Sequence, residues 1–154
     1  MRILVFSDSH GQTYKVKEAL RIHPEVNHII FLGDGEREMD LNILAPEMAH
    51  IPFTKVCGNN DYGSMLPVNE LVRAGGKLIF CTHGHYEAVR TGVSRLAEKA
   101  RSLNCDIALY GHTHVPFNKY IDGLYIMNPG TAWKGEYGII DIINGQISIN
   151  TTKI

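Results

Sequence analysis

The chain has 154 residues and a formal net charge of -1, with 44% hydrophobic and 20% charged residues. These values are typical of a globular protein, and we expect a single domain over residues 1–154. The near-neutral charge excludes an extended basic surface for nucleic acid. The three cysteines form no C-x-x-C pair, and no apolar run approaches the roughly 18 residues that span a membrane. We therefore expect a cytoplasmic protein with no disulfide framework and no membrane partner.

Apolar runs of strand length alternate with helical or turn-rich stretches over most of the chain. The predicted elements are strand 3–6, helix 14–22, strand 29–32, a weak helix over 39–48 broken by Pro46, strand 53–57, a hairpin of 70–73 and 78–81 around Gly75-Gly76, helix 89–103 and strand 107–110. Helix 89–103 has the clearest pattern, because Val93, Leu96, Ala97 and Ala100 lie on one face.

The last part of the chain has a different pattern, with short strands joined by tight turns. These predicted strands are 117–121, 124–127, 137–143 and 146–150. Asp122-Gly123 and Asn144-Gly145 are typical of two-residue hairpin turns, so we expect an antiparallel meander. Alternation of strands and helices followed by antiparallel strands favours an α/β fold in which two packed sheets are flanked by helices.

Polar motifs follow the carboxyl ends of five predicted strands. They are Asp8-Ser9-His10, Gly33-Asp34-Gly35, Gly58-Asn59-Asn60-Asp61, Thr82-His83-Gly84-His85 and Gly111-His112-Thr113-His114. Ligands bind at this edge of α/β sheets, so we expect the five motifs to meet in one cleft. Each motif alone is weak evidence, since Gly-Asp-Gly is usually an ordinary turn; their joint occurrence carries the prediction. His23, His28 and His50 lie outside the motifs, and we expect them to be ordinary histidines.

The side chains of these motifs are typical metal ligands. The candidates are Asp8, His10, Asp34, Asn59, His83, His112 and His114. Mixed imidazole and carboxylate ligation suits manganese, nickel, iron, cobalt or zinc better than an all-oxygen cage for magnesium or calcium. The set is too large for one tetrahedral zinc ion. It suits two divalent ions that share a bridging carboxylate, as in two-metal phosphoryl-transfer sites.

With these motifs in this order, the chain resembles the calcineurin-like metallophosphoesterase superfamily, in particular its small single-domain phosphodiesterases of bacteria and archaea. The resemblance extends from Asp8 to the turn Asn128-Pro129-Gly130. It implies a four-layer α/β/β/α sandwich of two mixed sheets flanked by helices, and two metal ions, with manganese the first expectation. It also implies that Asp8, His10 and His114 hold one ion, that Asn59, His83 and His112 hold the other, and that Asp34 bridges both.

Asn60 departs from the family pattern. Many members have histidine at this position, in Gly-Asn-His-Asp or Gly-Asn-His-Glu, and that histidine is taken as the acid that protonates the leaving group. An amide cannot supply a proton at neutral pH. Acid catalysis must therefore come from another residue or be missing. His85 is the nearest candidate acid, and Asp61 is expected to orient Asn60 or a metal ligand.

These features predict an enzyme that hydrolyses a small-molecule phosphoester, with a water between the two ions as the nucleophile. Lysine and arginine are sparse near the motifs, where Arg37 and Arg90 are the nearest. A site without a basic clamp favours phosphodiesters over doubly charged monoesters, and a phosphomonoesterase is the alternative. A non-catalytic scaffold relative of the same fold is a second alternative, which the complete ligand set disfavours. A zinc peptidase would need the absent H-E-x-x-H pattern. The sequence leaves homo-oligomer formation open.

Overall fold

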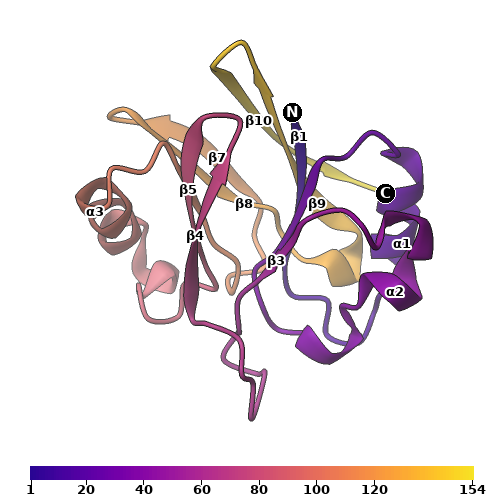
Figure 1. Ribbon diagram of the computed structural model, residues 1–154. Helices are drawn as coiled ribbons and strands as arrows, with labels where there is room; N and C mark the ends of the chain where they lie inside the picture. The colour runs from indigo at the N-terminus through magenta and orange to yellow at the C-terminus, as the bar shows by residue number, and fades with distance from the viewer.

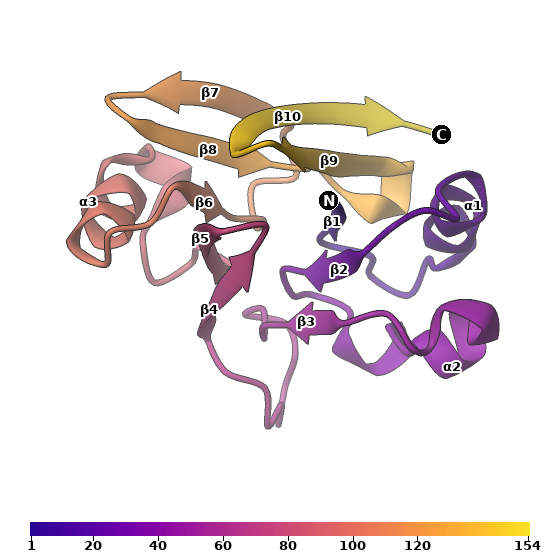
Figure 2. The same cartoon turned by 45° about the horizontal axis from the view of Figure 1, so that its top comes forward.

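A computed structural model describes residues 1–154 and confirms the expected sandwich of two mixed sheets and flanking helices (Figure 1). The strand orders of the two five-stranded sheets are β10-β9-β1-β2-β3 and β4-β5-β6-β8-β7. Helices α1 (Tyr14–Ile22) and α2 (Leu41–Leu44) cover the outer face of the first sheet, and α3 (Ser94–Ser102) covers that of the second (Figure 2). None of the helices combines the length and apolar character needed to span a membrane.

The first sheet is parallel from its middle strand to one edge and antiparallel on the other side. Its strands are β1 (Arg2–Phe6), β2 (His28–Phe31), β3 (Phe53–Lys55), β9 (Glu136–Ile143) and β10 (Gln146–Lys153). β1, β2 and β3 run parallel, whereas β9 and β10 are antiparallel to their neighbours. Both faces of β1 are buried, because Ile3 and Val5 enter the core between the sheets while Leu4 and Phe6 pack beneath the helices. This explains why its sequence is continuously apolar.

The second sheet is also mixed, but its antiparallel strands lie at both edges. Its strands are β4 (Asn69–Ala74), β5 (Lys77–Thr82), β6 (Ile107–Leu109), β7 (Phe117–Ile121) and β8 (Leu124–Asn128). β5, β6 and β8 run parallel, and β4 and β7 pair antiparallel at the two edges. Ile79 and Ile107 face the first sheet, while Phe80 and Ala108 pack against Leu96 of α3. Three buried parallel strands therefore end at the same edge.

The prediction of one continuous helix over 89–103 was wrong. A 3-10 turn, η3 (Val89–Thr91), precedes α3, and the two are separated at Gly92. Gly92 has a φ of 130°, which side-chain-bearing residues rarely adopt and which no helix contains. The apolar spacing continues across the break, because residues of both segments pack on the same sheet. The break at Pro46 is confirmed, since α2 ends before the 3-10 turn η2 (Pro46–Met48).

The prediction of a single terminal meander was also wrong. The β7–β8 hairpin belongs to the second sheet and the β9–β10 hairpin to the first. Between them the chain crosses from one sheet to the other through the Pro129-Gly130 turn and the 3-10 turn η4 (Ala132–Lys134). Local turn signals identified both hairpins, but the choice of sheet is made by non-local pairing of β8 with β6 and of β9 with β1.

Candidate metal centre

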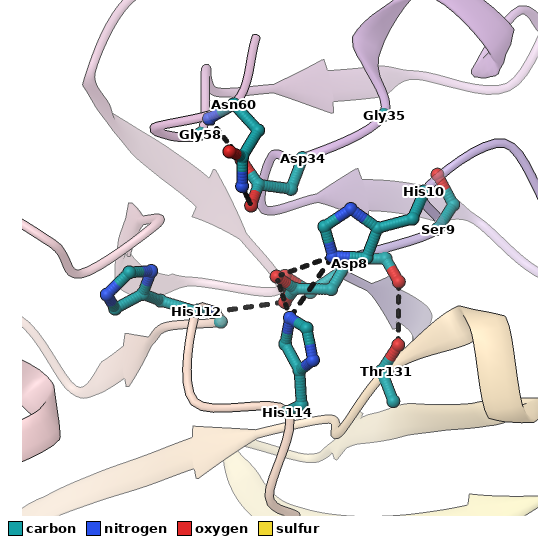
Figure 3. A network of polar contacts seen from close by, with 12 residues as sticks. Asp8, Ser9, His10, Asp34, Gly35, Gly58, Asn60, His112, His114 and Thr131 are labelled. Atoms are coloured by element: carbon teal, nitrogen blue, oxygen red, sulfur yellow. Dashed lines mark hydrogen bonds and ion pairs between the residues drawn. The ribbon is translucent and has the colours of Figure 1, made fainter.

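The structure brings the five motifs together at one edge of the sandwich. Asp8, Asp34 and Asn59 follow β1, β2 and β3 of the first sheet, while His83 and His112 follow β5 and β6 of the second. Side chains from opposite sheets meet there (Figure 3). The site therefore lies between the two sheets and takes ligands from both.

The backbone is unusual at this edge. Five candidate ligands have left-handed φ values, namely Asp8 at 54°, His10 at 44°, Asp34 at 60°, His112 at 65° and His114 at 57°. Residues other than glycine rarely adopt positive φ, and such strained residues cluster at functional sites. The concentration of strain in these loops marks the edge as functional.

Asp8, His10 and His114 form the first group of candidate ligands. The carboxylate of Asp8 is fully buried, and its Oδ1 has no hydrogen-bond partner. The Nε2 atom of His114 lies 3.0 Å from this oxygen and that of His10 lies 3.8 Å from it. The two Nε2 atoms are 3.1 Å apart. A buried oxygen without a donor, facing two imidazole nitrogens, fits a cation held among the three atoms.

The second group surrounds His83. Its Nδ1 donates a hydrogen bond to the carbonyl oxygen of Leu32 at 2.7 Å, which leaves Nε2 free to act as a ligand. That Nε2 lies 3.0 Å from Asn59 Oδ1, 3.3 Å from His112 Nδ1 and 3.5 Å from Asp34 Oδ2. Four ligand atoms from four loops thus converge within metal-binding range. The carbonyl contact of His83 is an arrangement common among metal-bound histidines.

The electrostatics of the centre also fit bound cations. Burial raises the pKa of Asp8 despite its contacts with His83 and Ser7. Burial lowers the pKa of His83, but the carboxylates of Asp34 and Asp8 outweigh it and raise that pKa. Burial, His83 and Arg90 lower the pKa of His112 to about 4, so its imidazole is neutral and able to donate a lone pair. The two carboxylates have only histidines as ion-pair partners, and a divalent ion would neutralise them.

Asn60 holds the carboxylate of Asp34. Its backbone N–H donates to Asp34 Oδ1 at 2.8 Å, and its side-chain amide donates to Oδ2 at 2.6 Å (Figure 3). Burial raises the pKa of Asp34, but the nearby imidazole of His83 and the hydrogen bonds from Asn60 outweigh burial and hold the pKa below the usual value. The side chain of Asn60 thus fixes the orientation of a candidate ligand.

Asp61 joins the loops after β2 and β3. Its carboxylate accepts hydrogen bonds from the backbone N–H groups of Asp34, Gly35, Glu36 and Gly58 at 2.7–3.0 Å. Burial raises its pKa, but these four hydrogen bonds outweigh burial and lower it. The carboxylate points at backbone rather than into the centre. Asp61 therefore holds the Asp34 loop in place.

Sequence reasoning missed several residues that hold the ligand loops. Glu38 Oε1 accepts hydrogen bonds from Ser9 Oγ at 3.0 Å and Gly11 N–H at 2.6 Å, one on each side of His10. Thr131 Oγ1 donates to the carbonyl oxygen of Asp8 at 2.7 Å (Figure 3). No spacing rule connects these partners, so the sequence held no signal for them.

Asn128 holds the His112 loop. Its side-chain amide donates to the carbonyl oxygen of Gly111 at 2.7 Å and to Thr113 Oγ1 at 3.0 Å, so it fixes both neighbours of His112. Its Oδ1 accepts from Gly130 N–H at 2.9 Å, which closes the Pro129-Gly130 turn. Gly111 itself must be glycine, because a Cβ there would collide with Ser7 Oγ. The turn that the family resemblance singled out is therefore a support for a ligand loop.

The remaining histidines fall into two kinds. His85 packs against the rings of Tyr86 and His83, at centroid distances of 4.3 Å and 5.5 Å, and its buried Nδ1 has no hydrogen-bond partner. Burial and the nearby His83 lower its pKa, which disfavours the protonated form that an acid catalyst needs. His23 and His28 lie away from the centre, where they contact Tyr137 and Thr54.

Comparisons with known proteins agree with this geometry. Residues 1–143 match the model of the calcineurin-like phosphoesterase superfamily domain. A probable metallophosphoesterase of Bacillus subtilis, YsnB, is 30% identical over 85% of this chain and 75% of its own. The phosphodiesterase MJ0936 of Methanocaldococcus jannaschii is 25% identical over 84% of this chain and 83% of its own.

A solved structure and a eukaryotic relative are also similar to this chain. The crystal structure of a predicted phosphoesterase from Streptococcus pneumoniae superposes with a TM-score of 0.82 at 26% identity, covering 99% of this chain and 88% of the other. The vacuolar protein sorting-associated protein 29 of Schizosaccharomyces pombe is 28% identical over 86% of this chain and 72% of its own. Given the family match over nearly its whole length, the chain belongs to the calcineurin-like phosphoesterase superfamily.

Proposed function

We propose that the protein is a metal-dependent phosphodiesterase with two divalent ions, manganese being the first candidate. The observation that carries the proposal is the buried, donor-less Oδ1 of Asp8 among imidazole nitrogens of His10 and His114. A buried carboxylate oxygen without a donor is costly, and a bound cation would offset that cost. The adjoining group around His83 offers a second position for an ion.

The ligands divide between the two ions as the family resemblance implies. In this assignment, Asp8, His10 and His114 hold the first ion, Asn59, His83 and His112 hold the second, and Asp34 bridges them. When bound, two such ions would activate a water and neutralise the charge that develops on the phosphate. The chain's own residues then have supporting roles: Asn60 orients the Asp34 carboxylate, and Asp61 holds the Asp34 loop.

The surroundings of the centre favour diesters over monoesters. Arg37 lines the adjoining cavity and Arg90 lies near enough to lower the pKa of His112, but no lysine lines that cavity. A site with so few basic side chains suits a singly charged diester better than a doubly charged monoester. The name of the related phosphodiesterase MJ0936 also supports this assignment.

The test compares bis(p-nitrophenyl) phosphate, a diester, with p-nitrophenyl phosphate, a monoester, after loading with Mn²⁺. We expect a higher kcat/KM for the diester and no activity in a matched His10→Ala variant, which excludes a contaminating hydrolase. A higher value for the monoester would assign the protein as a phosphomonoesterase. No hydrolysis of either ester would favour a non-catalytic role, the second alternative, which the similarity to a sorting protein supports.

A further inference from the structure

A cavity of about 320 Å³ adjoins the candidate metal centre. Its inner wall includes His10, Asp34 and Asn60, which belong to the centre or support it. Its outer wall comes from the loops after β2 and β3 and comprises Glu36, Arg37, Glu38, Asp61, Tyr62 and Ser64. A phosphate held at the centre would therefore direct one of its ester groups into this cavity.

The outer wall of the cavity is negatively charged. Three carboxylates, those of Glu36, Glu38 and Asp61, oppose the single guanidinium of Arg37. Hydrogen bonds from neighbouring loops fix the carboxylates of Glu38 and Asp61. The carboxylate of Glu36 has no such partner, since only the backbone N–H and carbonyl of this residue are hydrogen-bonded. Glu36 is therefore the acidic group free to meet a ligand.

The cavity is also polar rather than apolar. Tyr62 is its one hydrophobic residue, and this residue is 78% exposed. Hydroxyl groups of a ligand can donate hydrogen bonds to carboxylates, whereas a further phosphate would meet like charges. A purely hydrocarbon group would leave these polar groups without partners.

We propose that this cavity binds the alcohol part of the substrate and selects uncharged, hydroxyl-bearing alcohols, with Glu36 discriminating against additional anionic groups. This inference rests on the proposed phosphodiesterase function and adds its substrate class. Nucleosides and glycerol share the required chemistry, and both are small enough to be tested as simple p-nitrophenyl esters.

The first experiment compares p-nitrophenyl phosphodiesters of methanol, glycerol and thymidine (through its 5′ oxygen) on the Mn²⁺-loaded protein. We expect kcat/KM for at least one hydroxyl-bearing ester to exceed that of the methyl ester by roughly tenfold, as for a few added hydrogen bonds. The preferred ester then identifies the source of the alcohol. Equal values for all three would overturn the inference while leaving the phosphodiesterase function intact, whereas no hydrolysis of any diester would remove both.

The second experiment tests the charge of the wall. A 3′-phosphate added to the thymidine ester should lower kcat/KM roughly fivefold or more, because it brings an anion close to Glu36. Glu36→Gln should reduce this difference in kcat/KM between the thymidine esters with and without the 3′-phosphate. Glu98→Gln, an equal change of charge on the exposed face of α3, should leave it unchanged. Equal kcat/KM values for the two thymidine esters would contradict the role of Glu36. The same reduction of the difference in Glu36→Gln and Glu98→Gln would also contradict it.

Discussion

The Nε2 atoms of His10 and His114 lie 3.1 Å apart, although 104 residues separate them in the chain. Both nitrogens also face the buried Oδ1 of Asp8. Two imidazoles brought this close to a donor-less carboxylate oxygen are arranged as ligands, since each can present a lone pair to the same point. The loops after β1 and β6 are therefore built to share one cation.

Replacing Asp34 should affect both ions, because Asp34 is assigned as the bridge. We expect Asp34→Asn to weaken metal binding more than the roughly 10–100-fold loss typical of an outer-shell partner. Elemental analysis of the purified variant would measure the ions bound per chain. Asp122→Asn, the same change in an exposed hairpin turn, serves as the control and should keep full metal content. Two ions per chain in the Asp34 variant would contradict the bridging role.

Glu38 should matter for metal affinity although it is not a ligand. Glu38→Ala removes the acceptor that holds both neighbours of His10, so the Asp8, His10 and His114 group should lose affinity by roughly tenfold. Glu38→Gln keeps an oxygen acceptor and should restore most of that affinity. Calorimetric Mn²⁺ titration of both variants measures the effect. An unchanged affinity in the alanine variant would show that the His10 loop needs no such support.

Asp61 should stabilise the fold in a pH-dependent way. Asp61→Asn leaves part of its four backbone donors without an acceptor and should lower the free energy of unfolding by about 1–3 kcal/mol, nearer the lower value because the side chain is only half-buried. The folded pKa is lowered, so this contribution is present above the unfolded pKa of about 3.9 and is lost as pH falls below it.

Urea unfolding of the chelated proteins at several pH values measures that contribution. The stability difference between the native protein and Asp61→Asn should be full at pH 6 and should shrink towards acid. A stability difference that stays constant down to pH 3 would mean that the negative charge of Asp61 does not contribute to stability.

Because the side chain of Asn60 is an amide, we expect the rate of hydrolysis to depend steeply on the pKa of the leaving group. Without a proton donor at this position, the departing oxygen leaves unprotonated, so aryl diesters should be cleaved well and alkyl diesters poorly. General acid catalysis contributes roughly 10²–10⁴-fold, and Asn60→His should recover part of it for poor leaving groups only. A series of substituted phenyl esters on both proteins makes the comparison. If the rate of the native protein does not depend on leaving-group pKa while chemistry is rate-limiting, another residue acts as the acid. His85→Ala would then be the next variant to test.

Much of the site was predictable because its signals are local. Each ligand motif follows an apolar run such as Ile3–Phe6, and parallel buried strands place their carboxyl ends at one edge. Tertiary partners leave no such pattern. The acceptor role of Glu38 and the crossing after β8 depend on contacts between distant segments, and the break at Gly92 is hidden by an apolar spacing that continues through it.

The central claim is that two divalent ions, held by both groups of ligands, are needed for hydrolysis. The most direct measurement counts Mn²⁺ ions per chain in samples titrated from the chelated state, while hydrolysis of bis(p-nitrophenyl) phosphate is followed in the same samples. We expect no activity in the chelated protein and activity that rises until two ions are bound per chain. Full activity in the chelated protein, or saturation of activity at one ion per chain, would contradict the two-metal account.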